Sequence, residues 1–266
     1  MSELVKVETN LPAVGGMGVN FGNKLFQLKP TTLVINQGQT QAEGAVPGKL
    51  RIIETGDQFD ELTVVLLMEP DEARSWYIGE KGKLKRIPEN LMCFSRDMVK
   101  PDPRSKMPQA ITCESCKKHA WNNNVTPAMP PECDPYYFCL FVDTETQLPM
   151  KMFVTGIHKK PFESAMQQLS RTIRLMQARG ENPNLFDISF KISSSKYKNK
   201  DGQVNHQLKV DPKSFHKLTA EESEAFGPIY LNYVNRKGDV ADDVPEVKAN
   251  EKIAEAEQTI EGEIVI

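Results

Sequence analysis

Cysteines carry the clearest chemical signal in this sequence. Four of them follow the pattern Cys113-x2-Cys116-x16-Cys133-x5-Cys139. Two cysteine pairs separated by a loop of this length can place four thiolates tetrahedrally around one Zn²⁺ ion. Because four protein ligands leave no open coordination position, such a zinc is structural and not catalytic. The spacing therefore predicts a structural zinc site at Cys113, Cys116, Cys133 and Cys139.

Two points about these cysteines stay open. The gap between Cys133 and Cys139 is wider than the usual spacing of about two to four residues, and Cys139 lies in a strand-like Tyr-Tyr-Phe-Cys-Leu-Phe run. His119 is therefore the alternative fourth ligand, and a redox pair or unbound thiols is the alternative to zinc. Cys93, which lies between apolar neighbours, is interpreted as a buried small hydrophobe. We expect no secretory leader, and clustered cysteines in a reducing cytosol indicate metal ligands before disulfides.

The elements around the cysteines predict a mainly β protein with one long helix. The proline density between residues 100 and 135 argues against helices and central strands there, so metal binding has to order this insertion. A capping box at Thr219 and Glu222 predicts a short helix near the end. Periodicity and turn signals predict strands at 50–53, 62–68, 75–78, 136–142 and 150–157, a helix over 161–179 and a hairpin over 186–210.

The net charge of −3 conceals an uneven distribution. Residues 239–266 hold nine acidic and two basic side chains, whereas residues 1–238 hold 27 acidic and 31 basic ones. Within residues 151–217, thirteen Lys and Arg face five Asp and Glu. A basic body joined to an acidic tail indicates a nucleic-acid partner.

Aromatic residues are interleaved with this positive charge. Aromatic faces stack on unpaired bases while Lys and Arg follow the phosphates, and single strands require this combination. The lysine-rich tip at 196–200 also fits an ordinary solvated turn, and Phe138, Phe186 and Phe190 are expected to be core residues. The predicted nucleic-acid contacts are Trp76, Lys83, Lys85, Arg86, Lys117, Lys118, Trp121, Lys159, Lys160, Lys196, Tyr197, Lys198 and Lys200.

The acidic segment 239–266 is poor in aromatic residues and is expected to be disordered. It closes on Ile264, Val265 and Ile266, which is the form of a short docking peptide for replication or recombination proteins. Its carboxylates could also occupy the basic groove of the same chain. An inert solubilising tail is the alternative.

Enzymatic motifs are absent from the sequence. It contains no P-loop, GxSxG or HExxH pattern, and His119, His158, His206 and His216 form no short-spaced pair. We expect no enzyme, although a nuclease site assembled from distant carboxylates is an alternative. No apolar run approaches the roughly 18 residues of a membrane span, so we expect a cytoplasmic protein without a membrane partner, in the host cytoplasm if it is viral.

The predicted order of strand, helix and hairpin looks like the oligonucleotide-binding (OB) fold, which has a helix between its third and fourth strands. The C-terminal DNA-binding domain of the large subunit of replication protein A is similar in placing a four-cysteine ribbon early in such a barrel. With the acidic tail added, the chain resembles phage-type single-stranded DNA-binding proteins over residues 45–266. Its Ile-Val-Ile end differs from the Pro-Phe end of bacterial proteins, which puts recognition by bacterial partners in doubt.

The resemblance implies four parts of the chain: an N-terminal arm and strand at 1–48, an OB-fold-like barrel at 49–238, a zinc ribbon inserted at 100–140, and the tail at 239–266. It implies binding of single-stranded DNA in replication, recombination or repair, with the tail recruiting partners. RNA binding and a homo-oligomer stay open. The alternative function is a zinc-ribbon accessory factor for transcription or replication that acts mainly through protein contacts.

Overall fold

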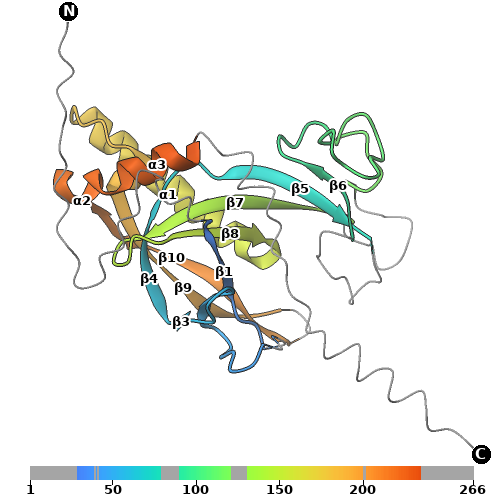
Figure 1. Ribbon diagram of the computed structural model, residues 1–266, viewed down its shortest axis with the longest axis horizontal. Helices are drawn as coiled ribbons and strands as arrows, with labels where there is room; N and C mark the ends of the chain where they lie inside the picture. Colours follow the sequence, from blue (N-terminus) through green and yellow to red (C-terminus); the bar gives the residue numbers. More distant parts are fainter. Residues whose placement is uncertain are drawn as a thin grey trace, which may run out of the picture.

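A computed structural model describes residues 29–38, 40, 42–78, 90–120, 131–199 and 202–234 (Figure 1). The described chain is mainly β sheet with helices, as the sequence predicts. The strands are β1 (Thr31–Ile35), β2 (Leu50–Ile52), β3 (Gln58–Phe59), β4 (Glu61–Leu66), β5 (Asp71–Tyr77), β6 (Leu91–Ser95), β7 (Cys133–Asp143), β8 (Pro149–Thr155), β9 (Ile188–Lys198) and β10 (Val204–Lys217). The α-helices are α1 (Lys159–Ala178), α2 (Ala220–Glu224) and α3 (Phe226–Val234), with short 3₁₀ turns η2 (Gly156–His158) and η3 (Leu185–Asp187).

The strands form one sheet in the order β10-β9-β4-β7-β8-β1-β2-β3, with β5 and β6 off this path. β4 and β5 follow one another along β7: β4 pairs with its C-terminal part and β5 with its N-terminal part, so together they act as one long bent strand. β4 also pairs with β9, β7 with β8, and β9 with β10, in each case antiparallel.

β1 lies between β8 and β10. It pairs with β8 in parallel. On the side that faces β10, the side chain of Gln37, just beyond the end of β1, makes the hydrogen bonds that strand pairing would otherwise provide. The Gln37 side chain donates to the His206 carbonyl at 2.7 Å and accepts from the His206 N–H at 2.9 Å. β1 therefore fills the gap that would otherwise separate β8 from β10.

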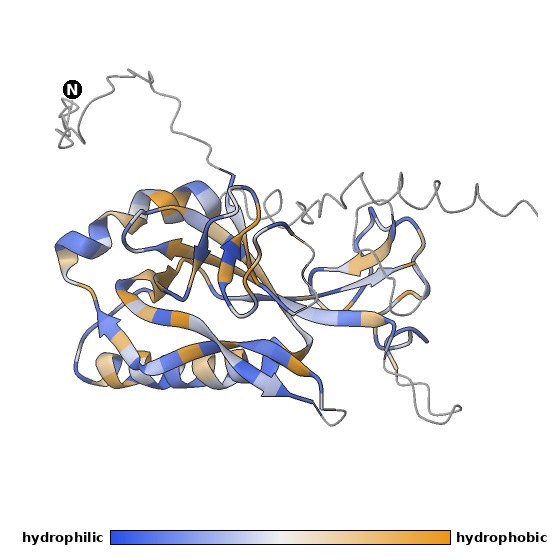
Figure 2. Ribbon diagram, turned by 90° about the horizontal axis from the view of Figure 1, so that it is seen from below, coloured by the Kyte–Doolittle hydropathy of each residue, from blue (hydrophilic) through white to orange (hydrophobic). Residues whose placement is uncertain are grey.

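Side chains alternate between two hydrophobic cores along β7, because successive residues of a strand point to opposite faces. Cys139 and Phe141 face a core that α1 covers with Phe162 and Leu169. Phe138, Leu140 and Val142 face a second core, which α3 covers with Phe226 and Tyr233. Figure 2 shows the bands of hydrophilic and hydrophobic residues that alternate along the strands.

Two elements differ from the sequence expectations. β6 (Leu91–Ser95) was not predicted, and the C-terminal helical region continues through α3 to Val234.

β7 begins inside the proline-rich region and contains Pro135, which pairs with Arg74 of β5. The strand tolerates a residue without an N–H there because β8 pairing begins only at Tyr136, which leaves β7 with β5 as its one neighbour.

The start of α1 is tied to β10 by His158. Its Nδ1 atom accepts a hydrogen bond from the Leu208 N–H at 2.9 Å, and burial lowers the pKa of the imidazole from 6.5. The folded protein therefore holds this histidine neutral, while the unfolded chain takes up a proton as the pH falls below 6.5.

We expect the unfolding free energy to fall as the pH drops through this range, because only the unfolded state binds the proton. In His158→Asn, whose side-chain oxygen replaces Nδ1 as the acceptor, this contribution should be absent. Urea unfolding of both proteins between about pH 5 and 8 measures the difference. A difference between the two proteins that does not change with pH would contradict the role of His158.

Candidate nucleic-acid interface and cysteine cluster

A small cavity lies where β6 and the start of β7 flank β5. Its volume of about 20 Å³ is enough for one water-sized body. The cavity is lined by four cysteines, Cys93, Cys113, Cys116 and Cys133, together with His119. The structure thus brings together three of the predicted ligands, the alternative ligand His119, and a cysteine that was interpreted as core.

A tight turn holds the Cys113–Cys116 pair against β7. The Cys116 N–H donates to the Cys113 carbonyl at 3.3 Å, and the His119 N–H donates to the Cys116 carbonyl at 3.0 Å. The Cys133 N–H then donates to the Lys118 carbonyl at 3.0 Å. These backbone bonds fix the turn beside the first residue of β7.

Cys139 lies apart from this cluster, and this corrects the predicted ligand set. It is completely buried in the core beneath α1, and burial raises the pKa of its thiol well above the ordinary value. Cys133 and Cys139 lie on the same strand, where a rise of about 3.3 Å per residue separates them by roughly 20 Å. Two ligands of one zinc ion each lie about 2.3 Å from the metal, so these two cysteines cannot share one.

Cys93, which the sequence analysis interprets as a buried small hydrophobe, lines this cavity with the other three cysteines. β5 pairs with β6 on one side and β7 on the other, and Trp76 is the partner of both Cys93 and Cys133. Burial raises the pKa of the Cys93 thiol, and the nearby Cys113 and Cys116 thiols raise it further, while a hydrogen bond with Ser105 lowers it. Burial likewise raises the pKa of Cys133 to about 12. No spacing motif indicates Cys93, because its position depends on the pairing of a strand that was not predicted.

The four thiols line the cavity without closing into a coordination sphere. All of them are free, and among the residues that the structure describes no three His, Cys, Asp or Glu side chains already converge as a metal site. The structure does place the four cysteines, which come from three separate segments, around one cavity.

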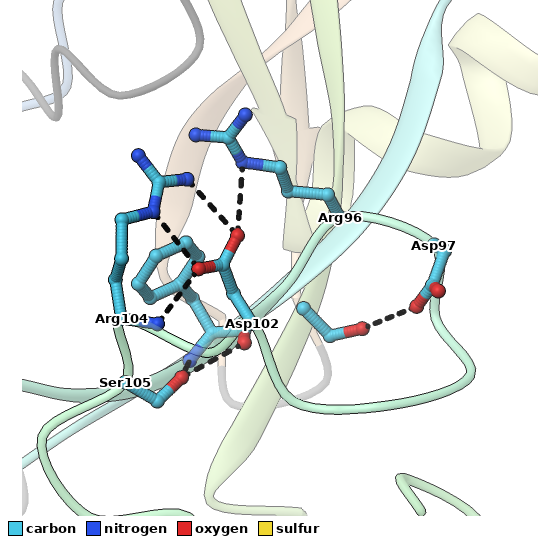
Figure 3. A network of polar contacts seen from close by, with 7 residues as sticks. Arg96, Asp97, Asp102, Arg104 and Ser105 are labelled. Carbon is cyan, nitrogen blue, oxygen red and sulfur yellow. Dashed lines mark hydrogen bonds and ion pairs between the residues drawn. The ribbon is translucent and has the colours of Figure 1, made fainter. Parts of the chain in front are cut away.

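Asp102 organises the loop that forms one wall of this cavity (Figure 3). Its carboxylate accepts hydrogen bonds from the Arg104 backbone N–H and from Arg104 Nε, each at 2.9 Å, and it forms an ion pair with Arg96 Nε at 3.4 Å. The hydrogen bonds with Arg104 and the charges of both arginines hold the pKa of Asp102 below its usual value. Backbone bonds between this loop and Phe94 of β6, such as Asp102 N–H to the Phe94 carbonyl at 2.8 Å, complete the attachment.

Trp76 is not available for base stacking in this structure. It is only 7% exposed, and the Lys118 Nζ lies 5.0 Å from the centre of its ring. Lys118 also pairs with Glu132 at 2.7 Å. Both predicted contacts therefore serve to fasten the cysteine turn to β5 and β7.

The other predicted nucleic-acid contacts among the described residues fall in three places. Lys117 is exposed beside the cysteine turn, and Lys160 is exposed at the start of α1. Lys159 is largely covered: its Nζ lies 4.8 Å from the Tyr137 ring centre and 3.8 Å from Glu72. An exposed cluster occupies the end of β9: Lys196, Tyr197 and Lys198. Five predicted contacts lie outside the described residues: Lys83, Lys85, Arg86, Trp121 and Lys200.

Tyr136 and Phe153 form an aromatic pair that the sequence did not single out as a binding feature. They lie on β7 and β8 with ring centres 5.6 Å apart in an edge-on arrangement, and both are half-buried. They pack at the margin of the core that α3 covers. Strand alternation alone does not identify this pair, because the extent of the α3 cover depends on tertiary structure.

A groove of about 500 Å³ runs beside α1 on the opposite face of β7. Its floor includes Tyr137, Phe162 and Met166, and Arg171 and Arg174 line it. It is a second surface with exposed positive charge, separate from the lysines near the cysteine turn and at the end of β9.

No protein-family model, curated protein or solved structure matches the chain. Within the described ranges, no helix has the length and apolarity that a membrane crossing requires.

We expect Asp102→Asn to lower the unfolding free energy by about 1–2 kcal/mol, because it weakens charge-assisted bonds to partly exposed arginines. Urea unfolding measures the loss, and Glu114→Gln is the control because Glu114 is an exposed carboxylate in the same region. Equal stability of the two variants would show that the Asp102 network does not hold this loop.

Proposed function

We propose that this protein binds single-stranded nucleic acid, with DNA as the first candidate, through an OB-like barrel. In this proposal β4 and β5 together serve as the first barrel strand, and β7, β8, β9 and β10 serve as the other four. The ligand would lie across β7 and β8, between the connection that carries the cysteines and the tip of the β9–β10 hairpin.

Strand pairing is the observation that carries the proposal. An OB fold is a partly open, five-stranded Greek-key barrel. Here the first strand pairs with the second and the fourth, the second with the third, and the fourth with the fifth. α1 lies between the third and fourth strands, as the sequence resemblance implied. The departure is β1, which occupies the position where the third and fifth strands would meet.

The location of the predicted contacts gives independent support. OB folds bind oligonucleotides on the face of strands 2 and 3 and with the loops between strands 1 and 2 and between strands 4 and 5. In this chain the first connection, 78–132, contains Lys117 and the cysteine turn, and the second follows Lys196, Tyr197 and Lys198. Figure 1 shows the start of β7, which carries Cys133, and the ends of β9 and β10 that meet at the hairpin turn on the side of the molecule away from α2 and α3.

Chemistry on the face between these loops is compatible with a single strand. Tyr136 and Phe153 provide aromatic surface on β7 and β8, whereas Lys117, Lys196 and Lys198 provide exposed positive charge. Aromatic residues that stack on bases and cations that follow the backbone are the two components of sequence-tolerant binding. The acidic segment 239–266, which lies outside the described residues, remains the proposed docking peptide for replication or recombination proteins.

We expect tight binding to oligo-dT, much weaker binding to duplex DNA, and an affinity that falls steeply with salt. For each phosphate neutralised on a single strand, the slope of log K against log salt should be about −0.7. Fluorescence anisotropy with labelled oligo-dT at several salt concentrations measures both quantities. No preference for single strands would refute the proposal and favour the accessory-factor alternative, and magnesium-dependent cleavage of the probe would favour the nuclease alternative.

We expect Lys198→Glu to weaken oligo-dT binding by about 10-fold or more and to reduce the salt slope, because it reverses charge at the hairpin tip. Lys213→Glu is the matched control: it makes the same charge change on the same hairpin, at the irregular pairing between Asp211 and His216. The control should stay within about twofold of the wild type.

Arg171→Glu distinguishes the two cationic surfaces. Because the α1 groove lies on the other face of β7, this variant should bind oligo-dT nearly as well as the wild type. If Arg171→Glu weakens binding and Lys198→Glu does not, the ligand lies in the α1 groove and the proposed face is wrong.

A further inference from the structure

The described part of the segment that carries the cysteine cluster, residues 90–120, shares in neither hydrophobic core of the structure. Within it, Val99 and Ile111 are 62% and 91% exposed. Figure 1 shows this green segment beyond the end of β7, away from the helices. Segments too small to bury a core usually depend on disulfides or a metal for their order.

A disulfide does not suit Cys93 and Cys133. Both are cross-strand partners of Trp76, so two strand spacings of about 4.8 Å separate their backbones by roughly 9.6 Å. Disulfides require Cα atoms closer than about 7 Å. The cavity that all four thiols line lies between these segments, and a metal ion there would be held by thiolates at about 2.3 Å each.

Arg74 supplies a second, independent sign of a ligand. Its side chain lines the same cavity, the residue is only 5% exposed, and its Nη1 atom is buried without a hydrogen-bond partner in the described structure. A buried guanidinium beside neutral thiols would be an uncompensated charge, which is costly. A divalent metal with four thiolates carries a net charge of about −2, which this arginine would offset.

We propose that Cys93, Cys113, Cys116 and Cys133 bind one structural zinc ion, and that Arg74 balances the charge of the complex. The tetrahedral four-sulfur set selects zinc among the common divalent ions. Binding would require the four cysteine side chains to turn toward the cavity that they line. This inference goes beyond nucleic-acid binding and does not depend on it.

Metal content and ligand identity can be measured on the full chain without nucleic acid. Protein purified under reducing conditions with zinc should hold about one zinc per chain by mass spectrometry of the metal. Cobalt-loaded protein should show the absorption of a tetrahedral site with thiolate charge-transfer bands. A chain that retains no zinc after buffer exchange and gives no such cobalt spectrum would overturn the proposal.

The fourth ligand is identified by two variants. Cys93→Ser should lose at least about 10-fold in zinc affinity and show weaker thiolate-to-cobalt absorption, whereas Cys139→Ala should retain both. Arg74→Gln should also bind zinc more weakly, and Arg74→Lys should restore part of the affinity. Retention of zinc in Cys93→Ser together with its loss in Cys139→Ala would refute the assignment.

Alkylation of the wild-type protein keeps the test valid if Cys93→Ser does not fold. Peptide mapping should show Cys93, Cys113, Cys116 and Cys133 protected with zinc and modified after a chelator is added. Cys139 should stay protected in both conditions, because it is buried in the main core. Equal modification of Cys93 with and without zinc would exclude it as a ligand.

Discussion

The alternation of side chains along β7 is the constraint on which the rest of the described structure depends. Over Phe138–Val142 the strand fills a core on each face at once, beneath α1 on one side and beneath α3 on the other. A shift of one residue in its pairing with β5 or β8 would exchange the two sets of side chains. The same register places Cys133 beside the cavity and Cys139 in the core beneath α1. The core packing of β7 therefore determines which of its two cysteines lines the cavity.

Lys118 connects the cysteine turn to the proposed binding face. Its carbonyl accepts the Cys133 N–H, its ammonium lies over Trp76, and the same ammonium pairs with Glu132. Trp76 is therefore part of the support of the turn. Lys117 precedes Lys118 in the chain, so this support also positions its exposed charge. A metal in the cavity would stabilise the position of these cations without contacting the nucleic acid.

Local sequence patterns predicted the elements whose structure is locally determined. The apolar spacing of α1, the alternation of β9 and β10, and the capping box at Thr219 each act over a few residues, and the structure contains the corresponding helix, hairpin and helix start. The fourth cysteine could not be found in this way. Cys93 reaches the cavity only because β6 pairs with β5, and the short run of β6 has no strict alternation. Conversely, Cys139 matched a spacing motif but belongs to a strand that is buried on both faces. The burial of Trp76 likewise follows from tertiary contacts and not from its polar neighbours in sequence.

The two parts of β7 are stabilised in different ways, one by burial of apolar side chains and the other mainly by hydrogen bonds. Over Phe138–Val142 the strand is paired on both edges and covered by helices, so burial of apolar side chains supplies most of its stability. From Cys133 to Pro135 it is paired with β5. The attached loop is held by the Asp102 network and by the backbone hydrogen bonds of the cysteine turn. Hydrogen bonds of this kind contribute only about 1 kcal/mol each, and many exposed side chains of the loop gain nothing from burial. In the proposed zinc site the buried Arg74 would balance charge, because neutral thiols leave its charge uncompensated whereas four thiolates bound to a divalent ion would offset it. The absence of residues 90–120 from both described cores, the four thiols around one cavity and the buried Arg74 guanidinium are the observations that favour the proposed anionic metal complex over an empty thiol cluster.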